Sequence, residues 1–547
     1  MDLRRLAACD AATDARYLSM VRTSPWSGVV VRMRMRPTIV VGIVLAGVMA
    51  MAPAGGPWEE LPKQQLEECT IGVASGRATA DGRPLVWKTR DADQVNNEVV
   101  WVVGSTYRFL AVVSAGSTTP WMGVNEKGFA ILNSLSSDLP AAAAGPGNGT
   151  LMKEALGTCA SVAEFQTLLD RTNLTGRTTQ ANFAVIDSTG AAAIFETAGT
   201  QYWKYDANDS SVAPQGYVLR TNFALHGGGS SGIERYRRTT KLIADFWTGD
   251  TLGYRSILRT QMRDFSDANS NPVPVPFPAR WQSNRPFGYI YCYLSICRST
   301  SVAAAVIQGV RAGEPARLST MWAILGQPAG AIAVPYWPVG NTPPAADGEP
   351  TAPLCDAALA IKSLLFDYAE NNNYIDSYKL RDGKGGGFWP KLFAEEDAIF
   401  ATADSLMVLW RATAVPPQVM LQAEAELATR ALSVLHQAYE AHLTSVSVAS
   451  GGPGGIPCAL SQPYPNPCNT STSLALFLPE PTEARVAVYD VMGEQVAVLC
   501  DGQLPSGEQR LTWDGRDDAG RLLPSGVYFV QARTAHWQQT RRCVLVR

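Results

Sequence analysis

The sequence predicts an α+β body followed by a small β-sandwich, and three observations lead to this fold class. Short runs of strand-forming residues, joined by glycine-containing turns, recur between Thr70 and Phe195, a pattern typical of antiparallel hairpins. A helical period dominates residues 418–442. A glycine- and proline-rich segment, Ser450–Pro457, precedes a tail of short strands at regular spacing. Hairpins mixed with helices favour α+β layers over a parallel βαβ domain.

The N-terminal segment has the three parts of a secretory signal. A basic stretch, Arg32–Arg36, precedes an apolar run, Ile39–Ala52, and a small-residue site, Ala52–Ala54. The alternative is a membrane anchor, but the apolar run is shorter than the ~20 residues that a bilayer span needs. We therefore expect an over-long leader at 1–54, a propeptide at 55–68, and an exported mature chain without a stable membrane span.

The body is expected to span residues 69–444. We expect strands at the following runs: Thr70–Val73, Pro84–Trp87, Phe129–Leu132, Phe183–Ile186 and Ala191–Phe195. The turns Asp81–Gly82 and Ser188–Gly190 join several of them. In the expected helix after Pro416 and Pro417, apolar side chains such as Leu427 and Leu435 fall on one face.

The tail is expected to comprise a linker at 445–460 and a β-sandwich at 461–547. We expect strands at these five runs: Leu474–Leu478, Val486–Tyr489, Val496–Leu499, Val527–Val530 and Cys543–Val546. Turn residues separate them, as at Asp490–Gly493, Asp514–Gly515 and Pro524–Gly526.

The composition excludes several classes of function. The 547 residues carry 46 Lys+Arg and 49 Asp+Glu, a net charge of -3, which argues against nucleic acid as a partner because phosphate binding needs a basic excess. The chain has four histidines and no CxxC pair, so we expect no metal site. We expect no organic cofactor either.

Cys69 is the first residue with a chemical role to test. The residues after it form a strand rather than a helix, and the candidate partner His226 lies in a glycine-rich loop, so a papain-type Cys–His pair is disfavoured. Cleavage between Glu68 and Cys69 would instead place a new α-amine beside the thiol. Because an α-amine has a pKa near 7.7–8.0, it can act as the base near neutral pH, and no histidine is required.

Ordered motifs along the body resemble the N-terminal-nucleophile cysteine hydrolases. The motifs are Cys69–Asp91, Gly123–Asn133, Asn182–Asp187 with Glu196, Leu219–Asn222, Ser230–Tyr236, and further Ser319–Trp322 with Gly326–Pro328. The chain is most similar to the acyl-coenzyme A:6-aminopenicillanate acyltransferase (peptidase C45) family and to the choloylglycine hydrolase and penicillin V acylase group. This resemblance covers most of residues 69–337 and implies a four-layer αββα core.

The resemblance also implies roles for individual residues. Cys69 would be the nucleophile and, after cleavage at Glu68–Cys69, also the base. Asn222 would donate its side-chain amide to the oxyanion, and Asn133 would contribute a backbone N–H beside it. Asp91 would hold the free α-amine, and Arg235 would brace the site through charge-assisted hydrogen bonds.

The sequence departs from the family at Lys88, where relatives usually have arginine. A lysine offers one point charge instead of a planar fork, so the electrostatic environment of the thiol would differ, although Arg90 could supply part of the missing guanidinium. Structural alternatives exist for the other site residues. Asparagines are common at turns, Arg235 could belong to a solvated helix face, and Asp91 could be a surface carboxylate.

The tail resembles the immunoglobulin-like domain of flagellar hook-capping proteins and the C-terminal sorting tails of type IX secretion substrates. The motifs are Tyr464–Thr472, Val488–Asp490, Trp513–Gly515 and Ser525–Phe529. A plain spacer is the alternative. Cys468 replaces a common phenylalanine in this pattern. Export would permit disulfides, and the local pairs Cys292–Cys297 and Cys458–Cys468 are candidates.

We therefore predict an exported, self-processing cysteine amidohydrolase or acyltransferase in the periplasm, at the cell surface or secreted. Its substrate would be a small linear amide or acyl donor, which reacts through an acyl-enzyme. The tail could engage export machinery. The alternative function is a catalytically inactive surface protein for binding or adhesion, built on the same fold.

Overall fold

The computed structural model describes residues 68–547 except 267–271, 349–350, 370, 449–457, 462, 464, 479 and 536. The expected leader and all of the expected propeptide except Glu68 lie outside the described residues. So does most of the expected linker. Within the described part, no helix combines the length and the apolar character needed to cross a membrane.

The nucleophile candidate lies in a six-stranded antiparallel sheet. Its strands run in the order β10-β1-β2-β12-β13-β14. They are β10 (Tyr217–Arg220), β1 (Glu68–Ala74), β2 (Leu85–Asp91), β12 (Ser301–Gln308), β13 (Thr320–Leu325) and β14 (Val334–Tyr336). Every residue of β2 and β12 is buried, so both faces of the sheet are covered.

A second sheet of seven strands forms an antiparallel meander from β3 to β9. The strands are β3 (Asn97–Val103), β4 (Arg108–Ser114), β5 (Met122–Asn125), β6 (Ala130–Leu135), β7 (Ala181–Ile186), β8 (Ala192–Thr197) and β9 (Tyr202–Asp206). All five strands expected in the body are confirmed, because each overlaps an observed strand: β1, β2, β6, β7 or β8.

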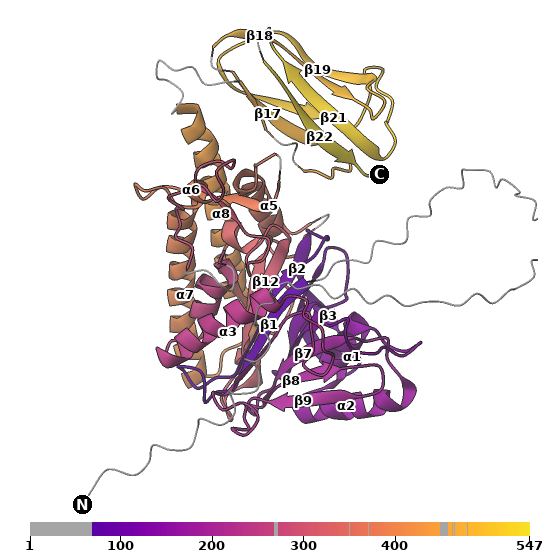
Figure 1. The fold of residues 1–547 in the computed structure, drawn as a ribbon, viewed down its shortest axis with the longest axis vertical. Helices are drawn as coiled ribbons and strands as arrows, with labels where there is room; N and C mark the ends of the chain where they lie inside the picture. The colour runs from indigo at the N-terminus through magenta and orange to yellow at the C-terminus, as the bar shows by residue number, and fades with distance from the viewer. Residues whose placement is uncertain are drawn as a thin grey trace, which may run out of the picture. The chain divides into compact units, whose positions relative to one another are not determined.

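The two sheets share one hydrophobic core. Ile71 and Val73 of β1 belong to the same buried cluster as Leu132 of β6 and Ile194 of β8. Side chains alternate along a strand, so Cys69, Ile71 and Val73 point to one face. That face of β1 therefore packs towards the seven-stranded sheet (Figure 1).

Helices cover the outer face of each sheet. α1 (Asn148–Thr158) and α2 (Val162–Thr175) pack on the seven-stranded sheet, where Phe165 contacts Phe183 and Phe195 edge-on (Figure 1). On the six-stranded sheet, Tyr254 stacks on Trp322 with ring centroids 4.7 Å apart. The helices on this side are α3 (Ile233–Thr248), α4 (Tyr254–Arg259), α5 (Pro353–Leu365), α6 (Ser377–Leu380), α7 (Phe388–Ala412) and α8 (Pro417–Val448).

The helix expected at 418–442 is confirmed within α8, and its apolar face is buried at Leu427, Ala431 and Leu435. Between α4 and β12 lie a short 3-10 turn and β11 (Tyr289–Tyr291), which pairs with β15 (Tyr374–Asp376). The body is thus a mixed helix-and-sheet structure, as the sequence predicts.

The C-terminal module, residues 458–547, has two sheets around its own core. One sheet has the order β16-β17-β20 and the other β19-β18-β21-β22. The strands are β16 (Ala459–Leu460), β17 (Thr472–Leu478), β18 (Thr482–Tyr489), β19 (Gln495–Leu504), β20 (Gly507–Trp513), β21 (Gly526–Arg533) and β22 (Gln538–Leu545). Trp513 and Tyr528 meet in that core at 5.1 Å.

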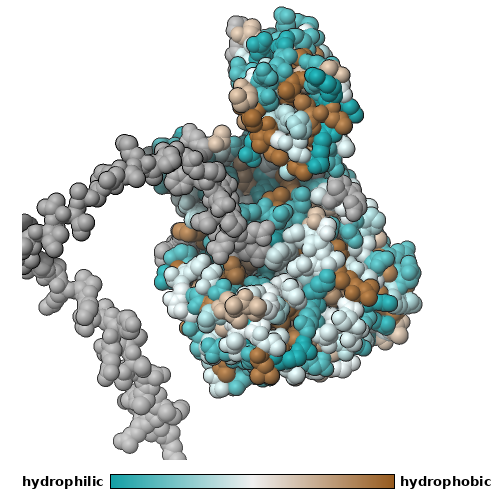
Figure 2. Space-filling view, turned by 90° about the vertical axis from the view of Figure 1, so that its right-hand side faces the viewer, coloured by the Kyte–Doolittle hydropathy of each residue, from teal (hydrophilic) through white to brown (hydrophobic). Residues whose placement is uncertain are grey.

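The five strands expected in this module are confirmed in β17, β18, β19, β21 and β22. Its surface mixes hydrophobic and hydrophilic residues (Figure 2). The most exposed large apolar side chains of this module, Val491 and Met492, occupy the turn between β18 and β19. Single exposed apolar residues at a turn are ordinary and do not mark a site.

The cysteine pairs expected from sequence proximity do not form. Cys292 and Cys297 are free buried thiols, one near the Asn373 carbonyl and the other near the Gln327 amide. Cys468 instead lies 3.8 Å, sulfur to sulfur, from Cys543 of β22. Sequence proximity misled here because the segment at Cys468 hydrogen-bonds alongside the last strand, which brings in a distant cysteine.

Candidate active site

Cys69 is the second residue of β1 and only 1% exposed. It lies opposite Arg90 in the β1–β2 ladder, and Ile71 lies opposite Lys88. Residues that face each other in an antiparallel pair project to the same side of the sheet. The Cys69 thiol, Arg90 and Lys88 therefore share the face that packs towards the seven-stranded sheet.

Asn222 and Arg235 hold the backbone of Cys69. The Cys69 N–H donates to Asn222 Oδ1 at 2.8 Å, and the Cys69 carbonyl accepts from Arg235 Nη1 at 2.6 Å. Arg235 Nη2 donates to Asn222 Oδ1 at 2.8 Å, which closes a ring of three hydrogen-bonded groups. Asn222 follows β10, the strand that pairs with β1 on its other edge, and Arg235 lies in the first turn of α3.

Local sequence allows Arg235 to approach this closely. Gly232 has a φ of 75°, and a Cβ there would lie 2.6 Å from Arg235 Nη2, so a side chain would displace the guanidinium. Arg235 is 2% exposed, and burial followed by repulsion from Arg298 lowers its pKa to about 10. It therefore remains charged at neutral pH. The alternative that Arg235 lies on a solvated helix face is wrong.

Asp91 lies across the ladder from Glu68, the residue that precedes the expected cleavage point. Asp91 Oδ2 accepts from Arg298 Nε at 2.9 Å, and Oδ1 accepts from Ser301 Oγ at 2.6 Å. Arg298 Nη2 also forms an ion pair with the Glu68 carboxylate. At 1% exposure, Asp91 is not the surface carboxylate that the alternative supposed.

Arg298 is a site residue that the sequence analysis missed. Burial alone would lower its pKa, but the carboxylates of Asp91 and Glu68 raise the pKa above its usual value. Arg298 precedes β12, and 207 residues separate it from Asp91. No local spacing indicates this contact, because only the pairing of β12 with β2 creates it.

Lys88 links the thiol-bearing sheet to the opposite one. It is fully buried, and its ammonium group donates to Asn133 Oδ1 at 2.8 Å and to the Trp121 carbonyl at 3.2 Å. Arg90 lies over the Trp121 ring at 4.4 Å. Asn133 lies within β6 and is also buried, so it is not a turn residue. Lys88, Arg90 and Asn133 thus form a buried polar layer between the sheets.

His226 is engaged away from this arrangement. Its Nδ1 lies 2.8 Å from Glu196 Oε2, and its ring stacks on Trp203 at 4.3 Å. Glu196 also accepts from Arg220 Nε at 2.7 Å. These contacts hold the start of the glycine-rich loop between Asn222 and Arg235. They agree with the expectation that His226 is not the base for Cys69.

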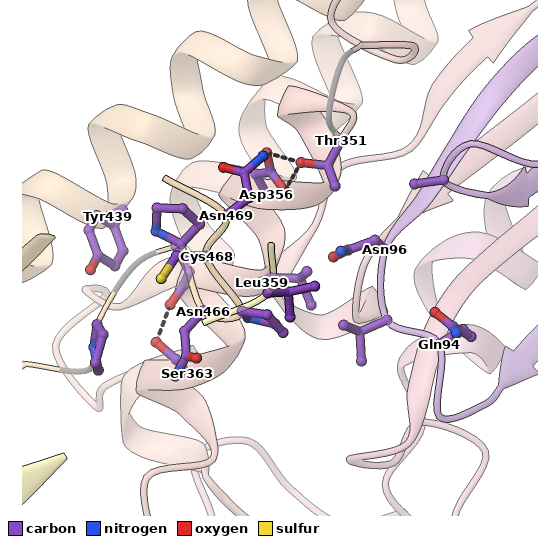
Figure 3. Close-up of a pocket in the computed structure, with 17 residues that line it drawn as sticks. Gln94, Asn96, Thr351, Asp356, Leu359, Ser363, Tyr439, Asn466, Cys468 and Asn469 are labelled. Atoms are coloured by element: carbon purple, nitrogen blue, oxygen red, sulfur yellow. Dashed lines mark hydrogen bonds between the residues drawn. The ribbon is translucent and has the colours of Figure 1, made fainter. Parts of the chain in front are cut away.

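A small cavity of about 210 Å³ adjoins the expected cleavage point. Its lining includes Glu68, Arg235 and Arg298, together with Tyr293 and Leu294. The pocket in Figure 3 contains neither Cys69 nor these arginines. Among its lining residues, the Thr351 hydroxyl donates to the Asp356 carboxylate at 2.8 and 2.9 Å, and the Ser363 hydroxyl donates to the Ala360 carbonyl at 2.7 Å (Figure 3). We therefore assign no chemistry to that pocket.

Comparison with known proteins gives separate results for the two parts. Residues 469–536 match the FlgD Ig-like domain family. No curated protein matches the chain. A mutant conjugated bile acid hydrolase from Clostridium perfringens is a structural neighbour with 12% identity and a TM-score of 0.29, and the match covers 47% of this chain and 89% of that one.

Two further structural neighbours are named as an amidase and an acylase. An N-acylethanolamine-hydrolyzing acid amidase ortholog from Caenorhabditis elegans has 13% identity and a TM-score of 0.29, over 44% of this chain and 92% of its own. Penicillin V acylase from Agrobacterium tumefaciens has 12% identity and a TM-score of 0.28, over 49% of this chain and 85% of its own.

Proposed function

We propose that this chain is a self-processing cysteine hydrolase of the N-terminal-nucleophile type, which cleaves linear amides through an acyl-enzyme. The observation that carries the proposal is the ring of hydrogen bonds among Cys69, Asn222 and Arg235 at the start of β1. Cleavage before Cys69 would turn its held N–H into a free α-amine in the same position. The α-amine base and the thiol nucleophile would then belong to the same residue, Cys69.

Self-processing would follow the same bond changes as substrate cleavage. The Cys69 sulfur attacks the Glu68 carbonyl carbon, the C–N bond to Cys69 breaks, and the departing nitrogen takes up the proton that the thiol loses. Water then hydrolyses the thioester, which releases the propeptide as a carboxylate. The Cys69 side chain is regenerated as a thiol, now beside its own α-amine.

In the mature enzyme, the α-amine takes the thiol proton and later returns it to the leaving amine. Asn222 Oδ1, which now accepts the Cys69 N–H, would accept an α-amine proton and direct the nitrogen lone pair to the thiol. Asp91, which Arg298 holds in place, would accept another proton of the same amine from the other side of the strand. The Asn222 amide nitrogen donates to the Leu135 carbonyl at 3.0 Å, so its role as oxyanion donor requires that bond to open.

Asn133 and Lys88 lie on the thiol side of the sheet, where negative charge would develop. We propose that Asn133 helps to bind the oxyanion and that the buried Lys88 ammonium favours the thiolate. A lysine at this position replaces the arginine of relatives without loss of the positive charge. The second candidate function is an inactive surface-binding protein on the same fold, because Lys88 stands where the catalytic relatives usually have arginine.

We interpret the two sheets and their outer helices as the four-layer αββα arrangement of the superfamily, with acyl transfer as an activity besides hydrolysis. The peptidase C45 affiliation rests on the ordered motifs. The C-terminal module would be a type IX sorting tail or a spacer, and export to the periplasm, cell surface or medium would follow from the leader.

Intact mass and N-terminal sequencing of the purified protein test the proposal. We expect a chain that starts at Cys69, whereas an intact Glu68–Cys69 bond in the mature protein would overturn it. A thiol-directed acyl analogue should label the wild type and fail to label Cys69→Ala. Cys159→Ala is the matched control, because Cys159 is also buried, and burial raises its pKa to about 11.

A further inference from the structure

The guanidinium groups of Arg235 and Arg298 lie together at the cavity beside the cleavage point. We propose that they form a subsite for a carboxylate on the acyl group of the substrate, and that the Glu68 side chain fills this subsite until the propeptide leaves. The proposal rests on the proposed function, because it names the class of amide that the processed enzyme would cleave.

The first observation is that a carboxylate already occupies the subsite. Arg298 Nη2 pairs with Glu68 Oε2, and Arg235 Nη2 lies 3.6 Å from the same oxygen. Both guanidinium groups belong to buried residues, with side chains 2% exposed for Arg235 and 6% for Arg298. Buried cations at fixed positions select an anion more strongly than surface cations do.

The second observation is the charge that remains after cleavage. Asp91 continues to accept from Arg298 Nε, but Glu68 departs with the propeptide. Two guanidinium groups would then face the cavity with one carboxylate partner between them. An unpaired buried charge is costly, so a substrate carboxylate that enters the vacated position restores the pairing.

The third observation is the number of carbon atoms between the backbone carbonyl of Glu68 and its side-chain carboxylate. In self-processing, Glu68 is the acyl donor, since Cys69 attacks its backbone carbonyl. Only Cα, Cβ and Cγ separate that carbonyl from the side-chain carboxylate, which is the spacing of a glutaryl group. A glutaryl amide that presents its carbonyl to Cys69 in the same way would therefore reach Arg298 with its carboxylate.

The cavity wall also suits a short carbon chain. Ile233, Tyr293 and Leu294 line it, and the last two are 48% and 45% exposed. Glu234 supplies the other carboxylate in the lining, and its Oε1 lies 3.4 Å from Arg237 Nη1. Because Glu234 would repel an anionic substrate, its removal provides a variant with the opposite expected effect.

The test compares matched p-nitroanilides with the processed enzyme. We expect kcat/KM for glutaryl-p-nitroanilide to exceed that of its neutral isostere, glutaramyl-p-nitroanilide, by about 10- to 100-fold. Succinyl and adipoyl anilides shift the carboxylate by one carbon. Their kcat/KM values should lie between those of the glutaryl and the glutaramyl anilide. Equal rates for the charged and neutral isosteres would overturn the subsite.

Two variants locate the effect. Arg298→Gln should reduce the glutaryl-to-glutaramyl ratio towards unity, whereas Glu234→Gln should preserve or raise it. Retention of the full ratio in Arg298→Gln would overturn the assignment of Arg298. The substrate comparison in the wild type remains decisive if Arg298→Gln does not fold or process.

The outcomes separate this inference from the proposed function. Hydrolysis of the neutral anilides without a preference for glutaryl would contradict only the carboxylate subsite. Butyrylglycine carries its carboxylate on the leaving amine instead of on the acyl group. A preference for butyrylglycine over butyrylglycinamide, without a preference for the glutaryl anilide, would therefore contradict a subsite on the acyl side. No hydrolysis of any anilide, together with no labelling of Cys69, would overturn the proposed function and the subsite with it.

Discussion

The Asn222 side-chain oxygen accepts the backbone N–H of Cys69 at 2.8 Å, although 153 residues separate the two. The antiparallel pairing of β10 with β1 creates this contact, because it brings Asn222, two residues beyond the end of β10, beside the first residues of β1. A backbone N–H inside a strand is normally satisfied by the neighbouring strand. Here a side chain satisfies it, so the contact can persist when the peptide bond before Cys69 is cut.

Asn222→Ala should slow both self-cleavage and amide hydrolysis by about 10²-fold, since the α-amine would lose the acceptor that orients it. Time courses of the mass shift and of anilide hydrolysis measure the two effects. Asn208→Ala is the control, because Asn208 is exposed and its side chain bonds only to the backbone of Gly190 and Ala192. Wild-type rates in Asn222→Ala would contradict the role given to the Asn222 oxygen.

Lys88→Met should slow alkylation of the mature Cys69 thiol by iodoacetamide about 10-fold at pH 7, because a nearby buried cation favours the thiolate. Lys88→Arg should retain most of the reactivity, since it keeps the charge. Lys241→Met, which breaks an exposed ion pair with Asp245, serves as the control and should react like the wild type. An unchanged rate in Lys88→Met would show that this charge does not act on the thiol.

Glu424 should make the stability of the body depend on pH. It is fully buried on α8, its Oε1 accepts from the Trp337 N–H at 2.6 Å, and its Oε2 has no hydrogen-bond partner among the described residues. Burial raises its pKa to about 8. The folded state therefore holds this proton up to about pH 8, whereas the unfolded chain releases it near pH 4.3.

The contribution of Glu424 to the free energy of unfolding is therefore fully present below about pH 4.3. It is lost as the pH rises to about 8. Glu424→Gln should melt like the wild type near pH 4 and be more stable by about 2–4 kcal/mol at pH 8.5. Glu426→Gln, an exposed change on the same helix, is the control. The same pH dependence of the melting temperature in Glu424→Gln and in the wild type would contradict the claim that Glu424 holds a proton in the folded state.

Cys468 and Cys543 should form a disulfide when the protein is treated with oxidised glutathione. Their sulfurs are 3.8 Å apart, and the Cys468 N–H donates to the Val544 carbonyl at 2.8 Å, so little movement is needed. Two thiols would yield one disulfide, and the oxidant would be reduced to two molecules of glutathione. Because the bridge spans 75 residues, it should stabilise the C-terminal module by about 2–4 kcal/mol.

Peptide mapping without reduction, together with thermal unfolding, measures this outcome. Cys500→Ser should still form the bridge, whereas Cys468→Ser and Cys543→Ser should not. A cross-link from Cys458 to Cys468 instead would restore the pairing that sequence proximity suggested. Retention of both thiols under oxidation would contradict the disulfide.

Local sequence determined the elements of this protein and its candidate nucleophile. Periodicity and turn residues predicted the strands around Cys69 and the long helix α8, because period and turn chemistry are properties of neighbouring residues. The same local reading failed for cysteine pairing, where Cys468 meets Cys543 rather than Cys458.

Tertiary structure decided what surrounds the thiol. Strand pairing brought Arg298 to Asp91 across 207 residues, and it placed Lys88 on the thiol side of the sheet and Glu68 on the side of the two arginines. Burial then turned ordinary charged residues into fixed partners, because charges removed from water must pair. Neither register nor burial can be read from one segment alone, since both depend on strands that are distant in the chain.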